Sequence, residues 1–431
     1  MNKSWFWNSV NKEISSLMTD VLCQDKFESK EEEVGAHIGA EILGPILFQM
    51  SNWIKVQSLE MEYLIFLSRE GKVLYDTYIY LYPEEKKNCG YLYVSRKSLI
   101  VPRLKDVKSY EEIIEVLVPL LQDTTVDNLL CILSGEKSYD RKVGIEIDKG
   151  KDVFSLDDVE KSAIVNLVRD NKEYYENQYR LLSTYLHSSI PEGNVAIIDV
   201  GWQGTMQKEI ETFFEETNFK GLYLGVRDKS NSIDFNSINR KGLFFEPGKN
   251  KKYDYMFRFA TDIVELLFYA FEGSTKSYSA HDLSVKPVLD EEEYIDKDRH
   301  KLKTIRKYSL KACVCIKEYI ESARQEVSIA ETMKVFSKFA VTPKNRVIGY
   351  FSGMSYKYTK SEPLLPDRSL LYYCVNSREL KQFLQRSGCK VFVLKKLFKV
   401  PLPYFAILCC LSKTVDIRGK QYMYLDGKKN V

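Results

Sequence analysis

The sequence predicts an α/β protein with a Rossmann-type parallel sheet at its core and a basic, mainly helical C-terminal region. Short apolar runs of strand length alternate with segments of helical spacing through the first 290 residues. This alternation is typical of a parallel sheet with helices on its faces. Several runs end in glycine, hydroxyl or charged residues that lead into a helix, and such strand ends are where ligands bind in open α/β sheets.

Charge is divided unevenly along the chain. The net charge is only +3, but residues 301–431 carry 26 Lys+Arg against 9 Asp+Glu, which is +17 and leaves about −14 for the rest. A basic end of this kind indicates an anionic partner, such as a membrane surface, a polyanionic glycan or nucleic acid. A solvated charged surface is the alternative.

Composition places the chain among globular proteins of two or three domains, with 431 residues that are 44% hydrophobic. The nine cysteines include no Cys-x-x-Cys pair, and no apolar stretch reaches the ~20 residues that span a bilayer. No long apolar signal region follows the first residues, so we expect a cytoplasmic protein with reduced cysteines. No metal-binding spacing links the four histidines, which are His37, His187, His281 and His300.

We divide the chain at two changes in composition. Residues 1–34 form a polar, acid-rich lead-in with an amphipathic helix, and the aromatic residues at 5–7 are expected to dock on the body. Residues 35–290 form the α/β domain that carries the site. Residues 291–431 form the basic helical domain.

Apolar runs bounded by turn residues predict the strands, because a strand buried on both faces has no polar alternation. This criterion selects 63–67, 91–94, 129–133, 195–198 and 222–226, with 243–245 as an edge strand.

Apolar residues three and four apart predict the helices between these strands. The clearest start is at Ser155, because Asp157 and Asp158 stand in the first turn of a long helix. A bend is expected at Gly44-Pro45, since proline interrupts helical hydrogen bonding. In chain order the helices cover 35–56, 72–82, 110–121, 155–188, a segment ending at 214, and 262–271, while 280–297 is expected to be a loop.

Three strand ends carry residues suited to phosphate or metal ions. Since consecutive parallel strands point the same way, these ends are expected to converge on one rim. Arginine binds two phosphate oxygens at once and lysine supplies a mobile positive charge, so the set indicates a dianionic ligand with hydroxyls or a divalent metal. Unrelated surface ion pairs are the alternative. The residues are Arg69 and Glu70 after the first run, Ser95, Arg96 and Lys97 after the second, and Asp199 after the fourth.

The loop after Asp199 is the centre of the predicted site. Gly201 and Gly204 would let the backbone approach a ligand, and the N–H groups of the following helix favour an anion. Thr205 would donate to phosphate, or alternatively only cap the helix. Trp202 would stack on a sugar or base, or alternatively pack against the following helix.

Three motifs carry a resemblance to a known family. In order, F-L-S-R-E-G, Y-L-Y-V-S-R-K-S-L and D-V-G-W-Q-G-T-M-Q resemble segments of proteins from bacterial capsule and O-antigen gene clusters. Those proteins include phosphoribosyl-pyrophosphate-dependent ribofuranosyltransferase modules and are often labelled hydrolases of the haloacid dehalogenase superfamily. The segment V-A-I-I-D-V-G-W-Q-G-T is also similar to the donor-binding loop of phosphoribosyltransferases. The resemblance covers roughly 35–279 and implies a phosphoribosyltransferase-like core.

Carried onto this sequence, the resemblance implies a role for each matching residue. Asp199 would contact the ribose hydroxyls, and the following loop would cradle the 5-phosphate. Arg69 and Gly71 would face the pyrophosphate, and Arg96 with Lys97 would neutralise the leaving group. The implied substrate-binding residues are Gly71, Ser95, Arg96, Lys97, Gly201, Trp202, Gln203, Gly204, Thr205 and Gln207.

Two positions depart from the family pattern. Nucleotide-pathway phosphoribosyltransferases usually show two adjacent acids before the loop, whereas Val200 follows Asp199 here. Glu70 stands where relatives commonly have aspartate. Both changes affect metal use, and we assign no set of protein ligands to a metal.

Loss of pyrophosphate gives the donor oxocarbenium character, so positioning the donor and stabilising the departing charge are the main catalytic tasks. An acceptor hydroxyl also needs a base. Glu265 is one candidate and Asp228 is another, with a solvated carboxylate as the alternative for each. The expected catalytic residues are Asp199, Arg69, Glu70 and Glu265.

The resemblance implies a glycosyltransferase that moves a (phospho)ribosyl group from phosphoribosyl pyrophosphate to a glycan acceptor, free or lipid-linked, in bacterial surface polysaccharide biosynthesis. It implies a separate phosphatase and no nucleic-acid partner, and it allows a role for Mg²⁺. The alternatives are a phosphohydrolase of the haloacid dehalogenase kind and a non-catalytic scaffold of a polysaccharide assembly complex. The hydrolase needs Asp-x-Asp at a strand end, and no predicted strand ends in one.

One apolar segment in the basic region stands apart. Residues 400–411 are bracketed by Lys395, Lys396, Lys399 and Lys413, and they are too few to span a bilayer. Peripheral contact with the inner face of the membrane is one interpretation. A buried core helix is the other.

Overall fold

The computed structural model describes residues 3–121, 124–134, 147–227, 238–290, 296–323, 325–355 and 363–414. At its centre is a five-stranded, entirely parallel sheet in the order β2-β1-β3-β4-β5. The α/β class and the edge position of the last strand are therefore confirmed. The strands are β1 (Tyr63–Leu67), β2 (Cys89–Leu92), β3 (Asn194–Asp199), β4 (Asn218–Gly225) and β5 (Arg240–Phe245).

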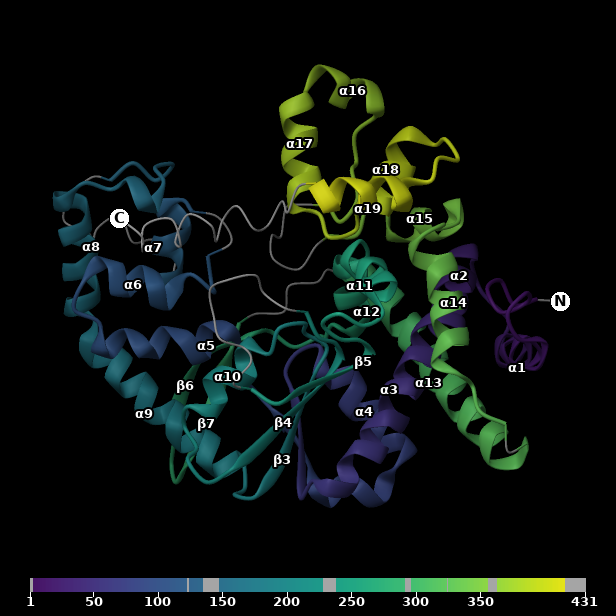
Figure 1. Cartoon of the computed structure of the whole chain (residues 1–431), viewed down its shortest axis with the longest axis horizontal. Coiled ribbons are helices and arrows are strands. Elements are labelled where there is room, and N and C mark those ends of the chain that lie inside the picture. The colour runs from purple at the N-terminus through teal and green to yellow at the C-terminus, as the bar shows by residue number, and fades with distance from the viewer. Residues whose placement is uncertain are drawn as a thin grey trace.

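Both faces of the central strands are buried, which explains why their sequences show no polar alternation. Along β1, Leu64 and Phe66 enter one apolar cluster, while Ile65 and Leu67 enter another on the opposite face. Figure 1 shows the helices that cover these faces, with α3, α4 and α13 on one side and α5, α9 and α10 on the other. Their bounds are α3 (Gly44–Gln57), α4 (Gly71–Leu81), α5 (Arg96–Ile100), α9 (Lys172–Ser189), α10 (Thr205–Glu211) and α13 (Asp296–Ala323).

Glycines allow α13 to pack unusually close to the first long helical segment. That segment runs from α2 (Lys30–Ile38) through a π-helical turn (Gly39–Leu43) into α3, so the irregularity precedes the expected bend at Gly44-Pro45. A Cβ on Gly39 would lie 2.2 Å from the carbonyl oxygen of Ile305. Only glycine therefore fits where the two backbones meet.

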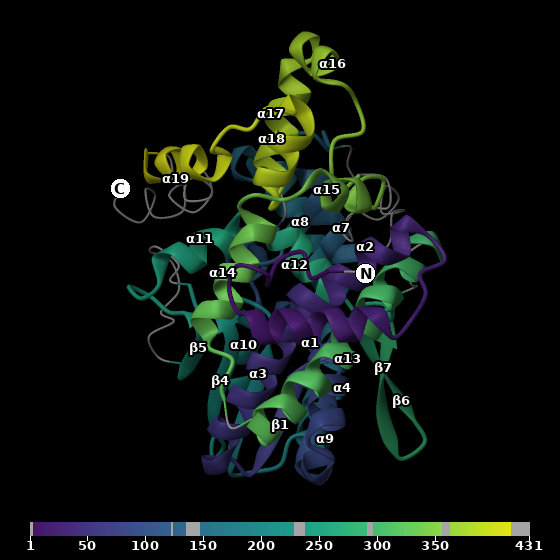
Figure 2. The same ribbon diagram turned by 90° about the vertical axis from the view of Figure 1, so that its right-hand side faces the viewer.

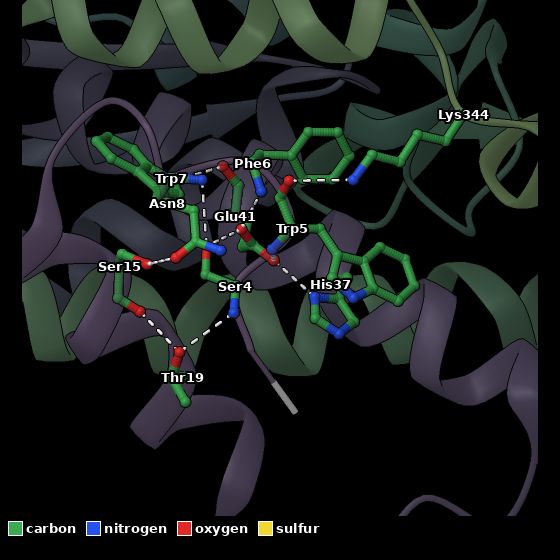
Figure 3. A network of polar contacts seen from close by, with 10 residues as sticks. All are labelled: Ser4, Trp5, Phe6, Trp7, Asn8, Ser15, Thr19, His37, Glu41 and Lys344. Carbon is green, nitrogen blue, oxygen red and sulfur yellow. Dashed lines mark hydrogen bonds and ion pairs between the residues drawn. The ribbon is translucent and has the colours of Figure 1, made fainter. Parts of the chain in front are cut away.

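The N-terminal segment docks on the body through the carboxylate of Glu41, as Figure 3 shows. The backbone N–H groups of Trp5 and Phe6 donate to it at 2.9 and 2.8 Å, and Ser4 Oγ donates at 2.5 Å. His37 Nδ1 lies 2.6 Å from Oε1 of this carboxylate, the oxygen that also accepts from Trp5. Phe6 and its neighbour Trp7 are fully buried, so the expected docking is confirmed. Helix α1 (Lys12–Cys23) follows.

A helical insertion with its own apolar core lies between β2 and β3. It contains α6 (Tyr110–Leu117), α7 (Val126–Ser134) and α8 (Asp158–Asp170). The strand expected at 129–133 is wrong, because Val126, Leu129, Leu130 and Leu133 are buried at the spacing of one helix face. The single helix expected over 155–188 is two helices that meet at Asn171.

A two-stranded antiparallel hairpin, β6 (Thr275–His281) with β7 (Ser284–Leu289), replaces most of the loop expected from 280. Only Thr275 and Tyr278 of its strand residues are buried, so no apolar run marked it in the sequence. The hairpin and the insertion lie on the same side of the main sheet as α9 in Figure 1.

The basic region is helical, as predicted, and its helices share the main core. Phe336 and Val393 belong to the same apolar cluster as β1 and α3, so this cluster crosses both predicted domain boundaries. No helix in the described ranges is both long and apolar enough to cross a membrane. The remaining helices are α11 (Lys251–Arg258), α12 (Thr261–Phe268), α14 (Ile329–Ala340), α15 (Asn345–Phe351), α16 (Leu370–Val375), α17 (Ser377–Arg386), α18 (Lys390–Phe398) and α19 (Tyr404–Thr414), with 3-10 turns at Ser58–Glu60, Pro83–Asn88, Val101–Asp106 and Val153–Ser155.

Candidate functional site

The strand order forms a topological switch point between β1 and β3, the position at which sheets of this kind form a ligand crevice. From β1 the chain first adds β2 on one side and then, after the insertion, adds β3 on the other. Doubly wound sheets with this 2-1-3-4-5 order bind ligands outside the carboxyl ends of the strands at such a switch point. Since β2, β1 and β3 are adjacent and parallel, the predicted convergence of three strand ends on one rim is confirmed at the level of topology.

Asp199 lies at the centre of this rim, and its side chain is only 7% exposed. Burial and the nearby charge of Glu70 raise the pKa of Asp199 to about 7. Backbone N–H groups of Gly201 and Val200 donate to its carboxylate, and together with Arg96 they act in the opposite direction on this pKa. A carboxyl group poised near neutrality in a crevice is typical of a functional site.

The glycines of the loop are required by close contacts. A Cβ on Gly201 would lie 2.6 Å from Asp199 Oδ2, so a side chain there would break the turn that holds the carboxylate. Gly204 has a φ of +75°, and a Cβ there would lie 2.9 Å from Arg240 Cδ. These contacts are within the protein. The path of the loop therefore needs both glycines whether or not a ligand binds.

Thr205 begins α10, and the N-cap position is occupied by Gly204, which provides no side-chain cap. The alternative in which Thr205 caps this helix is therefore not observed. Its side chain is partly exposed at the start of the helix.

Trp202 packs within the protein, but its ring contacts are with β5 and α11, whereas the predicted packing partner was the following helix, α10. Its ring stacks on Phe245 at a centroid distance of 5.9 Å, and the guanidinium of Arg227 lies 4.4 Å from its centroid. Arg227 also bonds Asp254 through Nε at 2.5 Å. Arg227 follows β4 and was missed, although its position beyond a strand end could have identified it.

Gln203 in the loop and Gln207 in α10 both have hydrogen-bond partners within the protein. The carbonyl oxygen of Gln203 accepts from Arg240 Nη1 at 2.8 Å. Gln207 is fully buried; its amide nitrogen donates to the carbonyl oxygen of Asn239, and its amide oxygen accepts from Tyr223. Gln207 therefore links α10 to Tyr223 of β4 and to Asn239, and its contact with a ligand stays a prediction.

Arg69 is held by an aromatic residue that no sequence pattern singles out. Its guanidinium carbon lies 4.7 Å from the ring centroid of Tyr269, and its Nη1 donates to the Tyr269 hydroxyl at 2.9 Å.

Tyr269 directly follows α12, which also carries Glu265 one turn earlier. The structure thus brings the helix of Glu265 beside Arg69, while Asp228 lies outside the described residues. Glu70 and Gly71 stand at the junction of β1 and α4.

The three residues after the second strand have different surroundings. Ser95 caps α5, because its Oγ accepts from the Ser98 N–H at 3.0 Å. Arg96 is exposed and acts electrostatically on Asp199. Burial lowers the pKa of Lys97, and the charge of Asp290, which follows the β6–β7 hairpin, acts in the opposite direction. The expected role of Lys97 beside Arg96 at the leaving group stays a prediction.

A tyrosine pair next to the rim was also missed. The hydroxyls of Tyr91 and Tyr93 both donate to Glu272, the latter at 3.2 Å. Burial, followed by Glu272 itself, raises the pKa of Tyr91. Lys72 lies 5.5 Å from the Tyr91 ring centroid. The partners are about 180 residues apart in sequence, so no local pattern could have linked them.

Two carboxylates, Glu70 and Asp199, interact at the rim. No group of three acidic, histidine or cysteine side chains suited to a metal occurs among the described residues. Magnesium commonly uses one or two carboxylates together with the phosphates of its substrate. The residues present therefore fit a metal that arrives with a phosphorylated ligand.

Comparison with known proteins identifies no relative: neither a family model nor a curated protein matches the sequence. The fold and the site define an α/β protein with an acid and two arginines at its switch-point crevice.

Proposed function

We propose that the rim of β2, β1 and β3 binds phosphoribosyl pyrophosphate and that the protein transfers a (phospho)ribosyl group to a glycan acceptor in bacterial surface polysaccharide synthesis. The observation that carries this proposal is the position of Asp199 beside Glu70 and Arg96 in the crevice between β1 and β3. Acidic side chains suit ribose hydroxyls, and the arginines suit phosphate.

The charges are arranged as a phosphorylated sugar requires. Arg69 and Arg96 lie on the strand ends to one side of Asp199, and the glycine loop lies on the other. With the ribose at Asp199, the pyrophosphate extends toward the arginines and the 5-phosphate toward the backbone of Gly201 to Thr205. Arginine is always charged, so Arg69 and Arg96 offset part of the pyrophosphate charge at any physiological pH, while backbone N–H groups meet the 5-phosphate.

The reaction breaks the C1–O bond to pyrophosphate, and the bonding electron pair leaves with pyrophosphate. An acceptor hydroxyl oxygen forms the new bond to C1 and releases its proton. Arg69 stabilises the departing charge, and Tyr269 holds its guanidinium in one orientation. Glu265 lies on the helix next to this pair and is the proposed proton acceptor.

Magnesium would be held by Glu70 and Asp199 together with the donor phosphates, and when bound it would neutralise part of their charge. Asp199 must be ionised for this role. Since its pKa is raised to about 7, protons compete with the metal below neutral pH. The product retains its 5-phosphate, so a separate phosphatase completes the pathway.

Calorimetry of the full chain with phosphoribosyl pyrophosphate and Mg²⁺ tests the proposal. We expect saturable binding below about 1 mM donor, and at least about tenfold weaker binding by Asp199→Asn. Glu192→Gln, at an exposed position before β3, is the matched control and should bind like the wild type.

Absence of wild-type binding at about 1 mM donor would contradict the proposal. Phosphate release from simple phosphate monoesters without an acceptor would instead support the phosphohydrolase.

A further inference from the structure

The C-terminal lobe, residues 363–414, exposes an unusual amount of apolar surface. Of the sixteen large apolar side chains that are exposed in the described chain, eight lie in this lobe. Scattered exposed apolar residues are normal, but a concentration in one region indicates an interaction site.

Helix α19 is apolar on both of its faces. Tyr404, Leu408 and Cys409 face the body, where they pack with Phe259 and Val391. On the opposite face, Ile407 is 41% exposed and Leu411 is 53% exposed. Ala406 and Cys410 are the other exposed residues on that side. A helix on an aqueous surface normally presents polar residues outward. The apolar outer face of α19 is therefore unusual for a face exposed to solvent.

The residues just before α19 expose apolar side chains as well. Phe398, Val400 and Leu402 are 39, 48 and 50% exposed. The stretch expected to be either a core helix or a membrane-interface segment is therefore buried on one face only. Figure 2 shows α19 projecting sideways from the lobe.

The lobe is also strongly basic. Its sequence contains 9 Lys+Arg and 2 Asp+Glu. Arg378, Lys381 and Arg386 on α17 are exposed, and so is Lys399, which separates α18 from α19. Apolar side chains flanked by exposed cations are complementary to a surface that offers both hydrocarbon and negative charge.

The dimensions of α19 exclude a span. Its 11 residues extend about 16 Å, which is roughly half the hydrocarbon thickness of a bilayer. Such a helix can lie in the plane of the interface with one face among the acyl chains.

We propose that the outer face of α19 and the residues just before it bind the surface of an anionic phospholipid bilayer. Val400, Leu402, Ile407 and Leu411 enter the interface, and Lys399 contacts the phosphate headgroups. This inference is independent of the proposed chemistry at the strand ends, since no residue is shared between the two sites.

Flotation of the full chain with vesicles tests this inference. The probes are phosphatidylcholine vesicles with and without about 30% phosphatidylglycerol. We expect wild-type protein to float with the anionic vesicles and to dissociate in about 0.5 M salt. Changing Ile407→Ser and Leu411→Ser together should weaken binding at least about tenfold, and Lys399→Glu should weaken it on anionic vesicles.

The control is Leu283→Ser, at the fully exposed tip of the β6–β7 hairpin, which should bind like the wild type. Circular dichroism should show the same melting temperature for all variants, because the changed side chains are exposed. Equal flotation of the wild type and the double variant, or no flotation of the wild type, would overturn the proposal. So would a wild-type dimer that the double variant converts to a monomer without any lipid binding, since a second copy would then be the occupant.

Discussion

The guanidinium of Arg69 rests on the ring of Tyr269, 4.7 Å from its centroid, and donates to its hydroxyl at 2.9 Å. This contact joins the end of β1 to the end of α12, two hundred residues later. It fixes the direction of a cation at the crevice. A mobile arginine would have to be ordered when a ligand binds, and that ordering reduces affinity.

Tyr269→Phe tests the importance of this orientation. The variant keeps the ring contact and loses the hydroxyl, so we expect donor binding to weaken about tenfold with little change in stability. Calorimetry with phosphoribosyl pyrophosphate measures the effect. Tyr80→Phe, on the exposed side of α4, is the control. Unchanged affinity in Tyr269→Phe would mean that Arg69 is positioned by other contacts or does not meet the donor.

Asp199→Asn is predicted to change how stability depends on pH. The pKa of Asp199 is about 7 in the folded chain and near its ordinary value of 3.8 in the unfolded chain. The folded chain binds more protons between these values, so wild-type stability falls as pH rises through this window, by at most about 4 kcal/mol. Asparagine does not titrate. The variant should therefore gain stability relative to the wild type between about pH 5 and about pH 8, as measured by urea denaturation. If the free energies of unfolding of Asp199→Asn and the wild type differed by the same amount at both pH values, the pKa of Asp199 would not be raised in the folded chain.

Gly39→Ala is expected to destabilise the fold by about 1–3 kcal/mol. The added Cβ would meet the backbone oxygen of Ile305 at 2.2 Å, and neither the π-helical turn nor α13 can move without disturbing the core. Gly349→Ala is a matched control, because nothing lies within 4 Å of a Cβ at that helical position. It should be neutral or slightly stabilising, since alanine favours helix. Similar thermal unfolding of the two variants would contradict this account of the packing.

Glu41→Gln is expected to release the N-terminal segment. The glutamine presents an amide nitrogen to N–H and O–H donors that need an acceptor, which should cost about 2–4 kcal/mol. Limited proteolysis should then cleave near the N-terminus sooner than in the wild type. Glu216→Gln changes an exposed carboxylate and should leave the cleavage pattern unaltered. If Glu41→Gln also left it unaltered, Glu41 would not be what holds this segment.

The strands of the sheet could be predicted because burial on both faces leaves a purely local signature. The same criterion failed at α7, where apolar residues at helical spacing are close enough together to resemble a strand. It also failed at the β6–β7 hairpin, whose exposed strands have no apolar pattern.

Of the candidate site, only the residues that stand at strand ends could be predicted from the sequence. Asp199, Arg69 and Arg96 belong to adjacent strand ends, and topology alone brings them to one rim. The influence of Asp290 on Lys97 could not be predicted, because the hairpin that Asp290 follows was not foreseen. Tyr269 and Glu272 contact the rim through the tertiary fold, which no local pattern encodes.

A crystal structure of the full chain with phosphoribosyl pyrophosphate and Mg²⁺ tests the central claim most directly. We expect ribose density at the Asp199 carboxylate, the 5-phosphate against the Gly201–Thr205 backbone, and the pyrophosphate within hydrogen-bond distance of Arg69 or Arg96. Donor bound elsewhere, with the crevice between β1 and β3 filled by water alone, would contradict it.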